Sequence, residues 1–154
     1  VLAFVLSLIN LLRKAARPAV DVLQGSDNPH LSLTTSNDGA KETVPGVIAM
    51  RFAAPIFFGN AQTLSAAIRR AVREAPNPVS AFVLDMEGVT DVDVTGAEAL
   101  AKELQWLQGK GITFAYSRVR PQLARLHLLQ GHHIFETNRA AVAALRPGSA
   151  TESG

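Results

Sequence analysis

The pattern of apolar and polar positions divides this chain of 154 residues into three parts. Residues 1–12 are apolar apart from Ser7 and Asn10, so an apolar helix is expected there. Polar, turn-forming residues dominate from 25 to 45 and predict a linker with little fixed structure. After residue 46, apolar runs of strand length alternate with segments whose apolar residues recur every three or four positions. The last part is therefore predicted to be one α/β domain.

Short strands and helices are predicted to alternate along this domain. Apolar runs that are typical of strands lie at 47–52, 56–58, 81–84, 112–116 and 134–135. Helical spacing follows the N-cap residues Asn60 and Thr137, and it recurs around Leu100–Leu107 and from Pro121 to Leu129. Because parallel strands need crossover connections, these elements predict a mixed, mainly parallel sheet of four or five strands with about four flanking helices.

The apolar N-terminal run ends in a basic group, Arg13, Lys14 and Arg17. As a helix the run extends roughly 18 Å, and it is short of the ~20 residues that cross a bilayer. A secretory signal has its positive charges before the apolar stretch, whereas here they follow it. This order is typical of the cytoplasmic end of a membrane helix, and an amphipathic helix buried in the domain is the alternative. We assign 1–17 to a transmembrane helix end and basic juncture, 18–45 to the linker, 46–146 to the domain and 147–154 to a disordered tail.

Composition limits the chemistry that the chain can perform. It contains no cysteine, which excludes disulfides, thiol nucleophiles and cysteine-ligated metals. The formal net charge is only +2 and most basic residues are scattered, so no nucleic-acid partner is expected. The sequence has no P-loop or glycine-rich phosphate cradle, and no convincing nucleophile or acid–base pair. We therefore expect a protein that is not an enzyme and that uses no cofactor.

The segment from Leu84 to Gly96 joins a predicted central strand to the next helix. In open α/β sheets, ligands and switches gather where the strands end. Thr95 and Glu98 have the spacing of a capping box, in which the Thr hydroxyl bonds an amide three residues on. Gly96 is then expected in the first helical turn, where open backbone amides can hold an anion.

Three other interpretations of the polar residues remain open. Asp85, Asp91 and Asp93 could form a metal or phosphoacceptor cluster, although Tyr-Ser-Arg follows the next strand in place of the lysine that response-regulator receivers use. Thr95 could be phosphorylated, although a capping hydroxyl is already engaged. The adjacent histidines at 132–133 could bind a metal, but neighbours on a strand face opposite ways. We expect a surface histidine pair and no metal site.

The same loop carries a resemblance to a known family. An apolar strand that ends in aspartate, then a turn, then Asp-x-Thr-Gly at 93–96 opening a helix, is similar to the signature of STAS domains. The likeness continues through the Gly-hydrophobic strand at 109–116 and the Val-Arg-Pro sequence at 119–121. STAS domains occur in anti-sigma-factor antagonists and in SulP anion transporters. The antagonists characteristically have Asp-Ser-Ser-Gly with the first serine phosphorylated, and Val94 stands at that position here.

The N-terminal half distinguishes between these two branches. Residues 11–25 resemble the juncture between the last membrane helix and the STAS domain of SulP proteins, although Gln24 interrupts the usual Leu-Gly. Residues 45–61 resemble that family's Pro-Gly, Arg-hydrophobic and Phe-x-Asn-Ala sequences. The likeness covers residues 1–146, which is nearly the whole chain.

The resemblance implies the STAS fold and the cytoplasmic regulatory and assembly domain of a membrane transporter for sulfate, bicarbonate or dicarboxylate anions. The full-length carrier is then expected in the cell inner membrane, as a homo-oligomer, with this domain on the cytoplasmic side. Its expected partners are the membrane-spanning part of the same transporter and a regulatory protein. The implied interaction residues are Asp93, Thr95 and Gly96 in a switch loop, and Phe58 and Asn60 on a second contact face.

The alternative function is a soluble anti-sigma-factor antagonist, a signalling protein that works by switching partners. The apolar run at 1–12 and the valine at position 94 both disfavour it.

Overall fold

The computed structural model describes residues 1–16, 19–25, 34–35 and 39–148. Within these residues the centre is a β-sheet with the strand order β2-β1-β3-β4-β5-β6. The strands are β1 (Val20–Gln24), β2 (Thr34–Thr35), β3 (Val47–Phe52), β4 (Ala81–Asp85), β5 (Thr113–Ser117) and β6 (His133–Phe135). The helices are α1 (Leu2–Ala16), α2 (Ala61–Glu74), α3 (Val94–Gly109) and α4 (Asn138–Leu145), with a short 3₁₀ helix, η1 (His127–Leu129).

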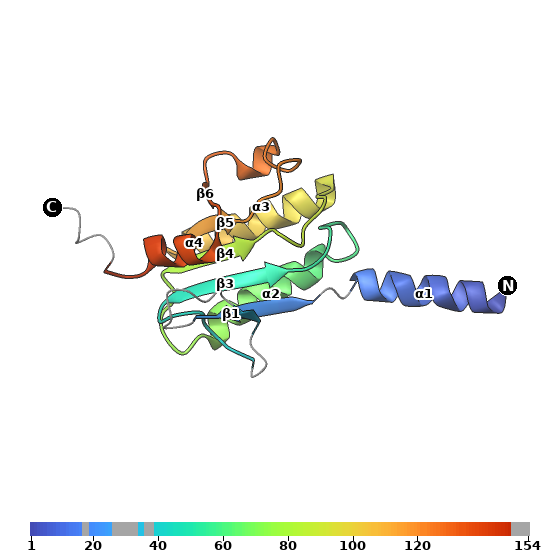
Figure 1. Cartoon of the computed structure of the whole chain (residues 1–154), viewed down its shortest axis with the longest axis horizontal. Helices are drawn as coiled ribbons and strands as arrows, with labels where there is room; N and C mark the ends of the chain where they lie inside the picture. The colour runs from blue at the N-terminus through green and yellow to red at the C-terminus, as the bar shows by residue number, and fades with distance from the viewer. Residues whose placement is uncertain (17–18, 26–33, 36–38, 149–154) are drawn as a thin grey trace.

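The sheet is mixed, and the loops that follow β3 and β4 lie at the same end of it. Strands β3 to β6 run parallel, and β1 pairs antiparallel with both β3 and β2. Because Val20 pairs with Phe52, the start of β1 lies at the end of the sheet where β3 finishes. α2 and α3 cover one face, α4 covers part of the other, and α1 projects from the domain (Figure 1).

The alternation of side chains along β3 divides the interior into two cores. Ile48, Met50 and Phe52 belong to the larger core, with the apolar side chains of α2 and α3. Val47 and Ala49 belong to the smaller core, with those of α4. β4 is buried along its whole length, as a central parallel strand with both faces covered should be. Each large apolar side chain that is fully buried contributes roughly 2 kcal/mol to stability.

The expected apolar helix at the N-terminus is present as α1, and it exposes its apolar side chains. The exposed residues are Val1, Leu2, Phe4, Val5, Leu6, Leu8, Ile9, Leu11 and Leu12. This exposure overturns the alternative in which the helix is buried in the domain. No helix in the described part of the chain is both long enough and apolar enough to cross a bilayer.

The linker predicted at 18–45 is wrong where β1 lies. Val20 and Val22 pack against the larger core and Leu23 is buried in the smaller one, so this strand is an integral part of the sheet. Residues 26–33 and 36–38 of the predicted linker lie outside the described residues, as do 149–154 of the predicted tail. With β1 the main sheet has five strands, and the two-residue β2 extends its edge.

Two further elements differ from expectation. The strand predicted at 56–58 is reduced to one bridge between Ile56 and Val92. The helix predicted from Pro121 is a series of turns that ends in η1. Leucines at 123, 126 and 129 recur every three residues, which suits a 3₁₀ turn better than an α-helix of 3.6 residues per turn.

Candidate functional site

Two loops meet where the parallel strands end, and the predicted interaction residues lie in these loops and in the first turn of α3. Residues 53–60 follow β3 and residues 86–93 follow β4. The Ile56 amide donates to the Asp91 carbonyl at 2.9 Å, and the Asp93 amide donates to the Ile56 carbonyl at 3.0 Å. Through these bonds the switch loop and the second contact face form one continuous surface.

Asp93 caps α3 and also holds the other loop. Its Oδ1 accepts from the Gly96 amide at 2.6 Å, and its Oδ2 accepts from the Phe58 amide at 3.3 Å. The predicted capping box is therefore wrong, because the helix begins at Val94 and both Thr95 and Glu98 are exposed beyond the cap. A carboxylate suits this position because it satisfies an unpaired amide at the positive end of the helix dipole.

Gly96 serves the packing of the two loops. It is buried, and a Cβ added to it would lie 2.6 Å from the Ile56 carbonyl oxygen. Its own amide is occupied by Asp93. The expectation that this glycine leaves open amides for an anion is therefore not supported by the geometry.

Asn60 precedes α2 as predicted, but its side chain does not cap the helix. Its Oδ1 accepts from the Phe57 amide at 3.0 Å, and its Nδ2 donates to the Pro55 carbonyl at 2.7 Å. The buried amide thus fixes the turn of the 53–60 loop from inside. Thr137, by contrast, caps α4 as predicted, because its hydroxyl accepts from the Ala140 amide at 3.1 Å.

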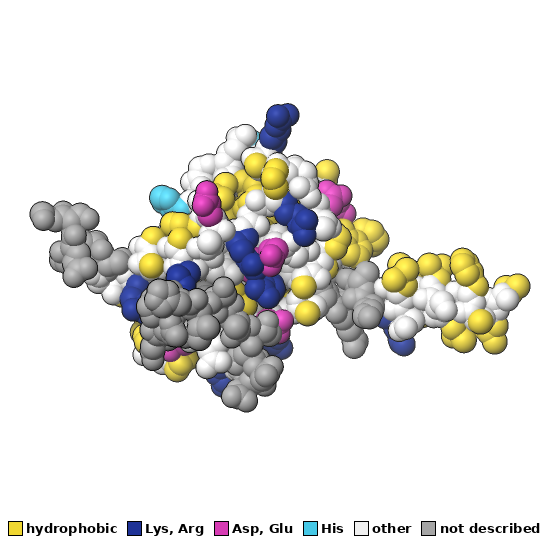
Figure 2. Space-filling model, viewed as in Figure 1, with side chains coloured by type: hydrophobic (Ala, Val, Ile, Leu, Met, Phe, Trp, Pro, Cys, Tyr) yellow, Lys and Arg dark blue, Asp and Glu magenta, His cyan; other side chains and the backbone are white. Residues whose placement is uncertain are grey.

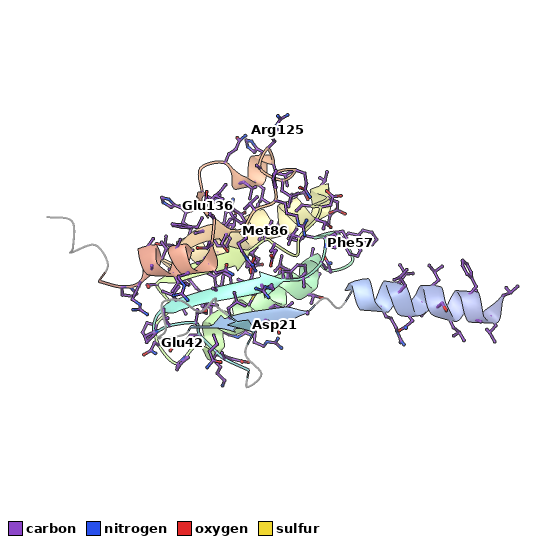
Figure 3. The ribbon with its side chains drawn as sticks, viewed as in Figure 1. Asp21, Glu42, Phe57, Met86, Arg125 and Glu136 are labelled. Atoms are coloured by element: carbon purple, nitrogen blue, oxygen red, sulfur yellow. The ribbon has the colours of Figure 1, made fainter. Side chains whose placement is uncertain are left out.

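Two apolar side chains of this surface are exposed to solvent. Phe58, in the turn before α2, is 73% exposed, and Val94, the first residue of α3, is 76% exposed. Phe57, the neighbour against which Phe58 packs edge-on, lies at the end of the domain from which α1 projects (Figure 3). A groove of about 500 Å³ continues from Phe58 between α2 and α3, lined also by Thr95 and Glu98. Such exposed apolar groups are typical of contact surfaces.

A buried carboxylate lies behind this surface, at the end of β4. Asp85 is fully buried and accepts from Arg51 Nε at 3.1 Å and from Arg118 Nε and Nη2 at 3.1 and 2.6 Å. Asn138 Nδ2 and the Glu87 amide also donate to it, at 2.9 and 3.0 Å. Figure 2 shows Lys and Arg side chains around an acidic one near the middle of the face in view.

These contacts settle the charge state of the cluster. Burial acts to raise the pKa of Asp85, but the hydrogen bonds from Arg118, Asn138, the Glu87 amide and Arg51 outweigh it and hold that pKa below its usual value. Burial acts to lower the pKa of Arg118, but its bonds with Asp85 and Glu87 leave that pKa raised. The cluster is therefore a charged pair network that joins three strand ends to α4.

The metal-site hypotheses find no support in the geometry of the described residues. Asp85 is engaged by arginines, and no group of three or more His, Asp or Glu among these residues could hold a metal ion. His132 packs edge-on against Phe114 and Tyr116, with ring centroids 5.8 and 5.7 Å apart. His133 is the first residue of β6 and is exposed, whereas His132 precedes the strand, so the two histidines are not neighbours on a strand as expected.

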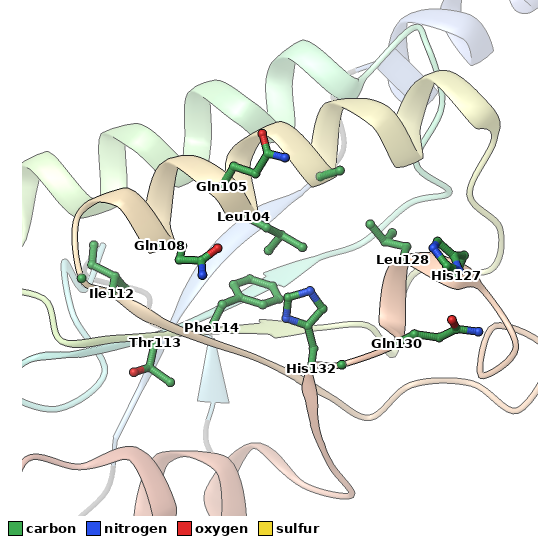
Figure 4. Close-up of a pocket in the computed structure, with 13 residues that line it drawn as sticks. Leu104, Gln105, Gln108, Ile112, Thr113, Phe114, His127, Leu128, Gln130 and His132 are labelled. Atoms are coloured by element: carbon green, nitrogen blue, oxygen red, sulfur yellow. The ribbon is translucent and has the colours of Figure 1, made fainter.

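A cavity of about 600 Å³ lies on the side of α3 away from the α2–α3 groove, between its last turns and η1 (Figure 4). Its apolar floor includes Leu104, Ile112 and Phe114, and its rim carries Gln105 and His127. No Asp, Glu, Lys or Arg belongs to its lining.

The structure is an α/β domain in which two loops at the carboxyl ends of the strands pack together and expose Phe58 and Val94. The sequence profile of the STAS domain matches residues 40–143. The chain therefore belongs to the STAS domain family, and the resemblance stated from the sequence is confirmed.

Curated relatives are sulfate transporters, as the SulP resemblance predicted. A probable sulfate transporter of Mycobacterium tuberculosis (strain H37Rv) is 32% identical over 154 residues, covering 94% of this chain and 27% of that protein. Sulfate transporter 3.1 of Arabidopsis thaliana is 24% identical over 133 residues, covering 81% of this chain and 20% of that protein. The chain thus spans 20–27% of the length of these relatives.

Solved structures confirm the fold class. The murine Solute Carrier 26 family member A9 anion transporter, in its inward-facing state, has a TM-score of 0.74 at 17% identity, covering 90% of this chain and 24% of that one. An anti-sigma factor antagonist from Mycobacterium paratuberculosis has a TM-score of 0.57 at 20% identity, covering 86% of this chain and 97% of that one. At these identities the likeness shows the α/β STAS fold alone.

Proposed function

We propose that this chain is the regulatory and assembly domain of a membrane anion transporter, on the cytoplasmic side of the cell inner membrane, and that it catalyses no reaction. One arrangement carries the proposal. The exposed apolar helix α1 leads into β1 at the end of the sheet where Phe58 and Val94 are exposed. The loops at 53–60 and 86–93 are therefore expected to lie close to the lipid or protein that covers α1.

Two further observations support a membrane partner. A helix with eight exposed large apolar side chains needs a cover of lipid or of other helices, because water solvates such a surface poorly. The relatives are transporters several times longer than this chain. In our proposal the partner is the membrane-spanning part of the same protein, which moves sulfate, bicarbonate or dicarboxylates and assembles as a homo-oligomer.

Uptake measurements test this proposal directly. Deleting residues 19–154 from the full-length carrier removes the sheet with β1 included, and should lower uptake of radiolabelled anion or the abundance of the carrier in the membrane. Sulfate, bicarbonate and dicarboxylate uptake are measured in parallel and normalised to membrane abundance. Unchanged uptake of all three at equal abundance would contradict the proposal.

One observation favours a second candidate, the anti-sigma-factor antagonist. Thr95 is exposed beyond the cap, so the hydroxyl that was expected to be engaged in capping does not cap α3. Val94, however, stands where the antagonists carry their phosphorylated serine, and it has no hydroxyl. We expect a serine kinase of the anti-sigma type to leave the chain unmodified. Stoichiometric phosphate on Thr95, seen by mass spectrometry, would place the second candidate first.

A further inference from the structure

The exposed apolar pair Phe58 and Val94, here called the Phe58–Val94 patch, is bordered by acidic side chains. Asp93 joins the two residues through the Phe58 amide and is partly exposed. Asp91, whose carbonyl binds the Ile56 amide, is exposed beside it. Glu98 is exposed one turn further along α3 and lines the groove that starts at Phe58.

The basic residues of the groove are at its far end, where one of them is already paired. Arg69 donates to Glu103 through Nε at 2.9 Å and through Nη2 at 3.1 Å. Lys102 is the other cation of the groove lining. The two loops and the start of α3, residues 53–60 and 86–98, contain the acidic residues Glu87, Asp91, Asp93 and Glu98 and no basic residue. The patch therefore presents an apolar centre inside a negative rim.

The negative rim distinguishes between two possible partners of a surface near the membrane, which are anionic lipid headgroups and a basic segment of protein. The Ala53 amide binds the Ala19 carbonyl at 3.1 Å, so the loop that carries Phe58 starts next to the point where the chain leaves toward α1. Anionic lipid headgroups on the cytoplasmic leaflet would be repelled by Asp91 and Glu98. Cytoplasmic loops of membrane proteins carry an excess of lysine and arginine, which these carboxylates attract.

We propose that the Phe58–Val94 patch binds a basic polypeptide segment, a cytoplasmic loop of the membrane-spanning part, through an apolar side chain on Phe58 and Val94 and cations on Asp91 and Glu98. This inference rests on the proposed function and specifies its partner. The apolar contact supplies affinity, and the charges set orientation and exclude acidic segments and anionic lipid.

Two designed peptides test the chemistry on the chain itself. One is a fluorescein-labelled 14-residue amphipathic peptide of leucine and lysine, and the other has glutamate in place of each lysine. Fluorescence anisotropy should show binding of the lysine peptide that weakens as salt rises, and weaker binding of the glutamate peptide. Asp91→Lys with Glu98→Lys should reduce affinity for the lysine peptide roughly tenfold. Val94→Ser should also reduce it.

The matched control is Glu136→Lys, which reverses an exposed charge beyond β6, away from the patch. Glu136→Lys should leave the peptide affinity unchanged. Because α1 is identical in all variants, any binding of the peptide to α1 contributes equally to each measured affinity. Circular dichroism confirms that each variant is folded. Equal affinity of the double variant and the control would overturn the proposal. Binding to phosphatidylglycerol vesicles through the patch, lost in Val94→Ser, would assign it to lipid and overturn it also.

The same double variant in the full-length carrier separates this inference from the proposed function. Lower uptake in both the double variant and the deletion of 19–154 supports both. Lower uptake in the deletion alone leaves the regulatory role standing and contradicts the basic-loop partner. Unchanged uptake in both contradicts both.

Discussion

Gly96 and Gly109 both lie in α3, but their surroundings differ. Alanine usually stabilises a helix interior by about 1 kcal/mol relative to glycine. At position 96 the added Cβ would lie 2.6 Å from the Ile56 carbonyl oxygen, so one loop must move and we expect Gly96→Ala to lose about 1–3 kcal/mol. Gly109→Ala is the control, since its Cβ meets no atom within 4 Å, and it should be neutral or stabilising.

Urea unfolding of the two glycine variants checks this prediction. Both should unfold with the m-value of the parent chain, so that the change in midpoint reports stability. A Gly96→Ala variant as stable as Gly109→Ala would mean that the two loops do not pack against each other as described.

At the same scale, the sequence identified the residues of the loop but not their roles. Asp-x-Thr-Gly contains two residues that can cap a helix, and the local pattern favours either one. The choice falls on Asp93 because its second oxygen also binds the Phe58 amide, 35 residues away in the chain. Asn60 is similar, since its buried amide bonds its own loop rather than the helix. The spacing of residues along the chain does not reveal contacts between two loops that are far apart in the sequence.

Among the elements, α1 stands apart because its apolar side chains are exposed to solvent. Removing residues 1–17 should leave a chain that unfolds cooperatively and elutes as a monomer, because α1 belongs to neither core. The complete chain should associate or require detergent, since large apolar patches promote association. Gel filtration and thermal circular dichroism compare the two. Loss of cooperative unfolding on truncation would show that α1 stabilises the domain.

The elements that the sequence predicted well are those with long, regular patterns. α2 and β4 have a clear apolar face and a continuous apolar run, and both appear where expected. β1 is not predicted by local pattern, because its five residues include two polar ones and show little periodicity, and its register depends on pairing with β3. The segment after β5 was predicted as a helix because leucines at intervals of three fit both helix types.

At the scale of the whole molecule, the Asp85 network connects parts of the chain that no sequence window contains. Its members come from β3, β4, the end of β5 and α4, and the Ser117 hydroxyl bonds the Asn138 side chain beside it. The sequence showed an aspartate at a strand end and an arginine after the next strand. Only the parallel register places them together, so the sequence pattern alone suggests a metal or phosphoacceptor cluster for Asp85 and does not predict its bonds with the arginines.

Acid should weaken this network in a defined pH range. The pKa of Asp85 lies below the ordinary 3.8 in the folded chain, so its contribution is complete above about pH 4 and is lost as the pH falls from there through the folded pKa. Asp85→Asn lacks this titration and should lose less stability than the parent between pH 5 and pH 3. Urea midpoints at each pH measure the difference, and parallel curves would contradict it.

Removing the carboxyl at neutral pH is the companion measurement. Asp85→Ala leaves Arg51 and Arg118 facing each other with 26% of each side chain exposed, and should cost about 3 kcal/mol. A cost below about 1 kcal/mol would mean that solvent satisfies both arginines and that the network is not structural.

In the proposed carrier, the orientation of the domain relative to the membrane follows from where β1 begins. The chain leaves the sheet at Ala19, at the end where β3 finishes, so the switch loop should face the membrane and the start of β4 should face away. This region has no cysteine, and Thr95→Cys and Asn77→Cys place one exposed label near each end of β4, about 20 Å apart. In the reconstituted carrier, lipids with headgroup nitroxides should quench a fluorophore at position 95 more strongly than one at 77. The same labels in detergent, without nitroxide lipid, should be equally bright. Stronger quenching at position 77 would mean that the domain has the opposite orientation and that the loops at 53–60 and 86–93 face away from the membrane-spanning part.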